Sequence, residues 1–220
     1  IALNLLIYQN YHMNMNKIDP KLKEKLVSAT NEVKNFLPPL SEISEDQART
    51  IIKRYTAAIE GNFLAWMGGA SISARSVVSR FAADENLWVE LKDDHSSMLR
   101  NFAKCCHAEP DSKDFQYVHA EALEIRNLVG ELSGLKNITL MATLENTSAA
   151  FIPWLAELAQ KLGCKDLTYT DVHGEADIEH ADQFLEALTD EQSLGYDNSE
   201  KDIDSTINLT LELLKKCFVL

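Results

Sequence analysis

Residues 171–184 read DVHGEADIEHADQF and place two histidines and an aspartate where they could bind a metal ion. On an α-helix, residues separated by four and by three positions fall on one stripe of the surface, and His173, Asp177 and His180 have this spacing. First-row metals such as iron and manganese accept imidazole nitrogens and carboxylate oxygens as ligands. A solvated polar helix face is the alternative interpretation of these three residues taken alone.

A metal site inside a helical bundle also needs carboxylates on the apolar sides of the neighbouring helices. Glu145 lies in LMATLENTSAAFIPWL and has no lysine or arginine within eight residues on either side. Because an unpaired glutamate is costly in apolar surroundings, we expect Glu145 to be a ligand rather than part of an exposed face with the Asn and Thr that follow it. Glu60, in YTAAIEGNFLAW, has similar neighbours, although the Gly and Asn after it could form an exposed face.

The segment NLWVELKDDHSSML contains Glu90 and His95, which are five residues apart. Five residues turn by about 140° on a regular helix, so the two side chains would not share a face. A π-bulge, which recurs at functional sites, would bring them together. Asp94 is the alternative partner of Glu90 because these two have the regular spacing i, i+4, and a charged exposed face is the remaining interpretation of the acidic residues here.

The composition indicates a globular, helical protein. Of the 220 residues 45% are hydrophobic, and eight glycines with five prolines are few for an all-β chain. The net charge of −13, from 21 basic and 34 acidic residues, argues against nucleic acid as a partner. No apolar run reaches the roughly 18 to 20 residues that span a bilayer, so no membrane partner is expected.

The cysteines and the beginning of the chain give two further expectations. The four cysteines, Cys105, Cys106, Cys164 and Cys217, show no C-x-x-C spacing, and the sequence shows no export signal. We therefore expect that the protein has no disulfide framework and lies in the reducing cytoplasm. Residues 1–18 are predicted to be an extension in which Met13 is a hypothetical native start. Residues 19–220 are predicted to form one helical domain.

Capping and helix-breaking residues predict seven to nine helices in that domain. Asp19 and Pro20 would begin a helix that runs to about Phe36, and a capping box at residues 44–47 would begin a long helix that Gly68 and Gly69 break or kink. Three further helices are predicted at about 71–82, at about 112–132 and at about 137–162, the last capped by Asn137. Three more are predicted to begin at residue 84, at Thr170 and at Ser199.

Together these residues resemble the haem-oxygenase-like diiron oxidases and oxygenases, which are relatives of the TenA and PqqC folds. The resemblance covers roughly residues 50–190 and is most specific at H-x-x-x-D-x-x-H, met by residues 173–180 after Tyr169. An upstream glutamate, Glu145, supports it, and residues 86–99 are similar to the element N-L-x-x-E…H-x-x-L. Glu60 is similar to a glutamate that some members use as a further ligand.

The resemblance implies an all-α, haem-oxygenase-like bundle that binds no haem and holds two iron ions, with manganese as an alternative. It implies O₂ as co-substrate and a small organic molecule as substrate, and a homodimer is also considered. The implied metal ligands are Glu60, Glu90, His95, Glu145, His173, Asp177 and His180. Tyr55 and Tyr169 are implied to lie beside these ligands or in the substrate pocket.

Other functions remain open at this point. A metal-free, TenA-like hydrolase would use a cysteine nucleophile, and Cys105 or Cys106 is the candidate, although no electropositive surroundings are evident near them. A helical module that binds other proteins without catalysis would need no metal. A cofactorless oxidase of the PqqC type needs a basic pocket, for which the arginines are too scattered along the chain.

Overall fold

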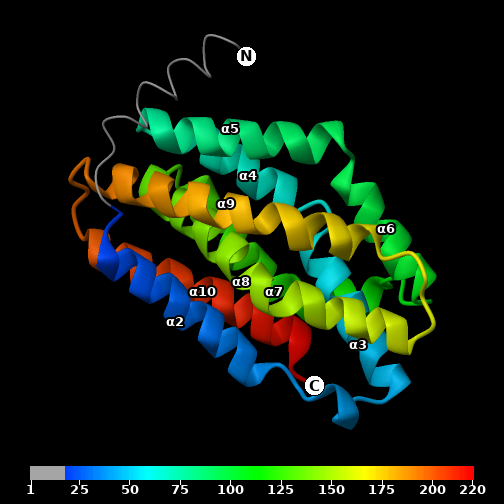
Figure 1. The fold of residues 1–220 in the computed structure, drawn as a ribbon. Coiled ribbons are helices and arrows are strands. Elements are labelled where there is room, and N and C mark those ends of the chain that lie inside the picture. Colours follow the sequence, from blue (N-terminus) through cyan, green and yellow to red (C-terminus); the bar gives the residue numbers. More distant parts are fainter. Residues whose placement is uncertain (1–17) are drawn as a thin grey trace.

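The structure is a computed structural model that describes residues 18–220, apart from the side chains of residues 175–178, and this part of the chain forms helices and no strand (Figure 1). The α-helices are α2 (Pro20–Phe36), α3 (Glu45–Ile59), α4 (Phe63–Ser73), α5 (Val77–Lys92), α6 (His95–Cys105), α7 (Ser112–Gly130), α8 (Gly134–Lys161), α9 (Thr168–Gln192) and α10 (Ser199–Phe218), with a 3₁₀ turn at Leu40–Glu42. The predicted all-α class is confirmed. The proposed start at Met13 lies outside the described residues.

The long helix α8 lies at the centre of the bundle, and most of its side chains are buried. α9 runs along α8 and makes the most extensive contact with it, while α2, α10 and α4 pack on its other sides. α5 lies against α4 and α9 at one edge of the bundle, and the short α6 follows it (Figure 1). Apart from Glu60, at the end of α3, the candidate metal ligands lie on α5, α6, α8 and α9, and α9 contacts each of the other three helices.

The first predicted helix starts are confirmed. The side chain of Asp19 accepts a hydrogen bond from the backbone of Lys21, and Pro20 is the first residue of α2. The capping box is formed at α3, where Ser44 and Gln47 each bond the other's backbone N–H. These contacts are local in sequence, which is why residue type and spacing predict them well.

The predicted break at Gly68 and Gly69 is wrong, because both lie inside α4. The chain turns earlier, at Gly61, whose φ of +72° favours glycine. Gly69 is needed for packing instead: a Cβ there would come within 2.2 Å of a methyl carbon of Val129, so glycine lets α4 approach α7 closely.

Several other predicted helix starts are also corrected. The helix expected at residues 71–82 and the start at residue 84 are replaced by α5, which Ser76 caps. α8 begins after Ser133, while the amide of Asn137 is buried and donates to the hydroxyl of Ser73. Thr170 lies inside α9, and Asn198 rather than Ser199 is the N-cap residue of α10.

The expectation that no disulfide forms is wrong. Cys105, at the end of α6, is bonded to Cys164, between α8 and α9, and their Cα atoms are 5.3 Å apart. The two cysteines are separated by 59 residues and meet only through the packing of the helices, so no sequence motif could reveal the pair. Among the described residues, no helix is long and apolar enough to cross a membrane.

Candidate metal centre

Glu90 and His95 meet because the chain breaks its helix between them. α5 ends at Lys92 and α6 begins at His95, and Asp94 between them adopts the left-handed conformation with φ 51° and ψ 51°. The Nδ1–H of His95 donates to Oε1 of Glu90 at 2.7 Å, and both side chains are buried. The expected π-bulge is therefore replaced by a sharp break, which achieves the same meeting of the two side chains.

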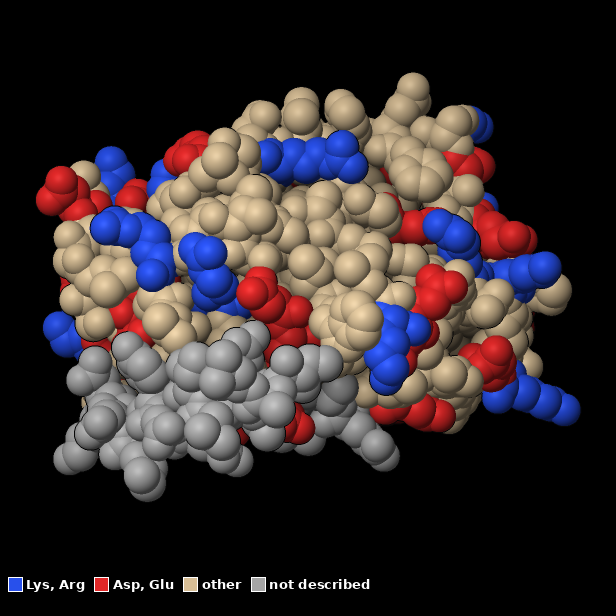
Figure 2. Space-filling view, turned by 90° about the horizontal axis from the view of Figure 1, so that it is seen from above, with Lys and Arg blue, Asp and Glu red and all other residues tan. Residues whose placement is uncertain are grey.

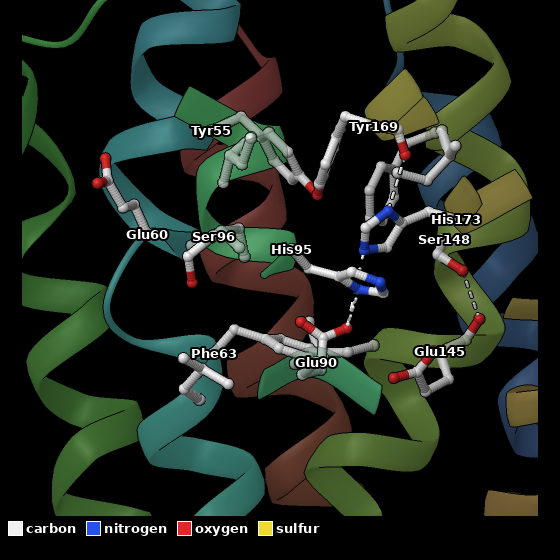
Figure 3. Close-up of a pocket in the computed structure, with 16 residues that line it drawn as sticks. Tyr55, Glu60, Phe63, Glu90, His95, Ser96, Glu145, Ser148, Tyr169 and His173 are labelled. Atoms are coloured by element: carbon white, nitrogen blue, oxygen red, sulfur yellow. Dashed lines mark hydrogen bonds and ion pairs between the residues drawn. The ribbon is translucent and has the colours of Figure 1, made fainter. Parts of the chain in front are cut away.

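His173 reaches the same carboxylate from α9. Its Nε2 lies 3.8 Å from Oε1 of Glu90, and its ring centroid lies 4.8 Å from that of His95. The Nδ1–H of His173 donates to the backbone carbonyl of Tyr169 at 2.7 Å, one helical turn earlier. This bond leaves Nε2 without a proton and points its lone pair at Glu90 and His95 (Figure 3).

Glu145 and His180 form a second group on α8 and α9. Nδ1 of His180 lies 3.7 Å from Oε2 of Glu145, which is buried among apolar side chains. Burial raises the pKa of Glu145, the nearby charge of Glu90 raises it further, and His180 and His95 oppose the shift. A carboxyl group with such a pKa is stabilised as an anion by any cation that enters the space between the two groups.

Two of the predicted ligands need separate description. Asp177 belongs to the course of α9, but its side chain lies outside the described residues. Glu60, at the end of α3, forms an ion pair with Arg100 and points away from Glu90 and His95 (Figure 3). It lines a cavity together with Glu90, His95, Glu145 and His173.

A cavity of about 50 Å³ opens onto the two groups. Glu90, His95, Glu145 and His173 form one wall, and the remaining lining is mainly apolar, from residues such as Ile59, Phe63, Leu64, Leu99, Phe151 and Ile152. A volume of this size holds a few water molecules or a very small ligand. The cavity therefore combines a polar wall that could hold ions with an apolar wall that limits access of water.

Tyr55 and Tyr169 both line this cavity, as predicted for residues of the substrate pocket. Their hydroxyl oxygens are 2.6 Å apart and share a hydrogen bond in the buried interior. The ring of Tyr169 packs against His173 with 4.3 Å between centroids. Tyr169 thus positions His173 twice, through its backbone carbonyl and through its ring.

The donor set fits a metal ion. In the described part of the chain, Glu90, His95 and His173 each offer one ligand atom, and these atoms lie within 4.8 Å of one another. Nε2 of His95 is buried without a hydrogen-bond partner, which is costly unless something binds it. Burial also lowers the pKa of His173, against the effect of Glu90, and so keeps its imidazole neutral as a metal requires.

Some residues of the site were not anticipated from the sequence. Ser96 and Ser148 line the cavity, and Phe63 and Phe151 form part of its apolar wall. Small polar and aromatic residues on amphipathic helices are common throughout the chain, so no sequence signal distinguishes these four. Only the helix packing places them beside the ligands.

One of three comparisons with known proteins gave a match, and it is to a family. Residues 54–212, well over half of the chain, match the model of a haem-oxygenase-like family whose description is iron-containing redox enzyme. The matched range includes every candidate ligand. Neither the search of curated proteins nor the search of solved structures gave a significant match.

Proposed function

The chain belongs to the haem-oxygenase-like family of iron-containing redox enzymes, and we propose that it is a non-haem diiron oxidase or oxygenase that uses O₂ to oxidise a small organic substrate. The carrying observation is the meeting of Glu90, His95 and His173, whose ligand atoms lie within 4.8 Å of one another, while Nε2 of His95 is buried without a hydrogen-bond partner. A histidine nitrogen in this state, next to a carboxylate and a second neutral imidazole, is the arrangement that a transition metal completes.

Two ions are proposed because the ligands form two groups. Glu90, His95 and His173 would hold one iron, Glu145 with His180 would hold the other, and Asp177 is proposed as a further carboxylate ligand. The charge of Glu90 contributes to the raised pKa of Glu145, which supports two groups that lie within reach of each other. Glu60 stays a candidate further ligand that would first have to leave Arg100. Manganese would accept the same donors.

When bound, iron supplies the electrons that the reduction of O₂ requires. The residues of this chain then have separate tasks. The carbonyl of Tyr169 fixes the tautomer and the direction of His173, and the hydrogen bond between Glu90 and Nδ1 of His95 holds these two side chains together in the metal-free chain. The apolar wall of the cavity restricts water, which protects reactive species and strengthens the electrostatic interactions inside.

The cavity favours a small substrate. Its volume of about 50 Å³ holds a few water molecules or a very small ligand. The substrate is proposed to be a small, mainly apolar molecule that contacts Phe63, Leu99 or Phe151. A cytoplasmic location stays a prediction, although the Cys105–Cys164 disulfide removes the argument from unpaired cysteines.

The alternative of a cysteine hydrolase is poorly supported. Cys105 is bonded to Cys164 and offers no thiol. Burial raises the pKa of Cys106 to about 11, so little nucleophilic thiolate forms near neutral pH. No cysteine is among the described residues that line the cavity. A metal-free interaction module is the remaining alternative, and metal analysis separates it from the proposal.

The test is to load the purified protein with Fe(II) under anaerobic conditions, remove unbound metal and measure the iron content of each chain. His173→Ala and His180→Ala should each lose iron, because each removes a ligand from one of the two groups. His119→Ala is the matched control, since this histidine is exposed on α7 and should leave the iron content unchanged. Wild-type iron content in both site variants would exclude the assignment.

A further inference from the structure

The short helix α6 carries part of the candidate metal centre at one end and a disulfide at the other. Its first residue is His95, and its last residue, Cys105, is bonded to Cys164 in the connection between α8 and α9. α9 begins a few residues later, and His173 lies in its second turn. The disulfide therefore joins α6, which carries one candidate ligand, to the segment that leads into α9, which carries another.

A line of direct contacts runs from the disulfide to His173. Phe102, one turn before Cys105, is buried, and its ring centroid lies 5.6 Å from that of Tyr169. Tyr169 contacts His173 through its ring and accepts the hydrogen bond of its Nδ1–H through the backbone carbonyl. A movement of α6 at its disulfide end would thus disturb the orientation of His173 as well as the position of His95.

The noncovalent contacts that hold α6 in the bundle are limited. Apart from its first residue, its buried side chains are Leu99, Phe102 and Ala103. Its ion pair joins Glu60 to Arg100, whose side chain is 62% exposed, and exposed ion pairs contribute little to stability. Figure 2 looks onto the bundle from the side of α5, and acidic and basic side chains lie intermixed at its right, toward α6. A covalent bond at the end of so short a helix therefore has a large share in keeping it in place.

The disulfide lies where a reductant can reach it. Cys105 is half-buried, and Lys104 and Lys165, which follow the two cysteines along the surface, are exposed. An external dithiol reduces such a bond in two exchange steps. One thiolate of the reductant attacks a disulfide sulfur and forms a mixed disulfide, and its second thiol then closes a ring and releases the second cysteine. Two electrons and two protons pass to the protein, which gains two thiols, while the dithiol becomes a cyclic disulfide.

We propose that the Cys105–Cys164 disulfide controls how fast the metal centre exchanges its iron, and that reduction by a dithiol switches the centre to fast exchange. A cross-link excludes open conformations in which α6 leaves the bundle, while it changes the closed conformation little. Without the bond, α6 opens more often and exposes His95. This inference rests on the proposed function, because it concerns the iron that Glu90, His95 and His173 hold.

The two groups of ligands respond differently. Iron release from the group that contains His95 should become about tenfold faster on reduction, a change within the range that loss of a cross-link produces. Glu145 and His180 lie on α8 and α9 and not on α6, so the iron that they hold should leave at the same rate in both states. Reduction should therefore divide iron release into a fast and a slow phase.

The first experiment loads the full chain with Fe(II) under anaerobic conditions and follows the transfer of iron to a coloured chelator. The oxidised chain is compared with a chain that dithiothreitol has reduced and from which the reagent has been removed. The double variant Cys105→Ser, Cys164→Ser should release iron like the reduced wild type, and it has no new thiols that bind iron themselves. Cys106→Ala removes a buried free thiol beside the disulfide, and this control should respond to dithiothreitol as the wild type does. Circular dichroism verifies that each variant is folded.

Hydrogen–deuterium exchange of the metal-free chain provides a readout that needs no iron. Amide exchange in α6 should become about tenfold faster on reduction, while exchange in α2, on the other side of the bundle, should not change (Figure 1). Equal rates of iron release in the oxidised and reduced chains would overturn the inference and leave the proposed function intact. Fast release from the reduced wild type but not from the double serine variant would also overturn it, because the freed thiols would then be the cause. A chain that binds no iron in either state would contradict the proposed function and this inference with it.

Discussion

Asp94 is the residue on which the meeting of Glu90 and His95 depends most directly. It adopts the left-handed conformation, and its side chain accepts a hydrogen bond from the backbone N–H of Ser97 at 3.3 Å, as the N-cap of α6. Asp94→Ala removes both contributions. The left-handed conformation costs alanine about 1 kcal/mol, and loss of the cap costs about 1 kcal/mol more.

The expected total for Asp94→Ala is therefore about 2 kcal/mol. If the chain keeps the break, the free energy of unfolding of the metal-free protein falls by that amount. If the helix instead continues through Asp94, Glu90 and His95 turn apart, and the affinity for Fe(II) falls by up to about thirtyfold, since 1.4 kcal/mol is a factor of ten. Urea unfolding and anaerobic Fe(II) titration together measure both parts.

Two further substitutions separate the causes. Asp94→Asn keeps the cap and tolerates the left-handed conformation, so it should match the wild type in both assays. Asp94→Gly keeps the conformation and, as an N-cap, loses only a few tenths of a kcal/mol. The reasoning is refuted if Asp94→Ala equals the wild type in stability and in Fe(II) affinity, or if glycine is the more damaging substitution.

Three other predictions concern the stability of the metal-free chain, each measured by urea unfolding. Glu191 is fully buried and accepts hydrogen bonds from the backbone N–H groups of residues 75 and 76 and from Tyr196, so Glu191→Ala should lower the free energy of unfolding by about 3 kcal/mol; an unchanged value would contradict this role. Removing the Cys105–Cys164 bond with serine at both positions should cost about 4 kcal/mol, as expected for a closed loop of 59 residues. A loss below 1 kcal/mol would indicate a loop that is already restricted in the unfolded chain. Burial lowers the pKa of His173 below 6.5, so the unfolded chain binds the extra proton first and stability should fall as the pH drops below about 6.5. His173→Gln should reduce this dependence, and an unaltered pH profile would show that other groups cause it.

The parts of the fold that the sequence predicts well depend on local contacts. Asp19 with Pro20 and the capping box at Ser44 act within one helical turn, and the structure has both. The prediction fails where a distant helix decides the outcome. Gly69 reads as a helix breaker but provides a close approach of α4 to α7, and the start of α5 is held by Glu191 from α9.

The same difference between local contacts and contacts from distant helices applies to the candidate site. The spacing on α9 and the apolar neighbours of Glu145 predict His173, His180 and Glu145 as ligands; in the structure His173 lies near Glu90 and His180 lies near Glu145, and their role as ligands stays a prediction. The meeting of Glu90 with His95 could be expected only as an exception to regular helix geometry, because its actual cause is the conformation of one residue between two helices. The pairing of Glu60 with Arg100 depends on tertiary packing and had no sequence signal.

The central claim is that this chain holds two iron ions between Glu90, His95 and His173 on one side and Glu145 and His180 on the other. The most direct test is the ratio of tightly bound iron to protein after anaerobic loading of the wild-type chain and removal of free metal. We predict two iron ions per chain. A chain that retains no iron under these conditions would contradict the account.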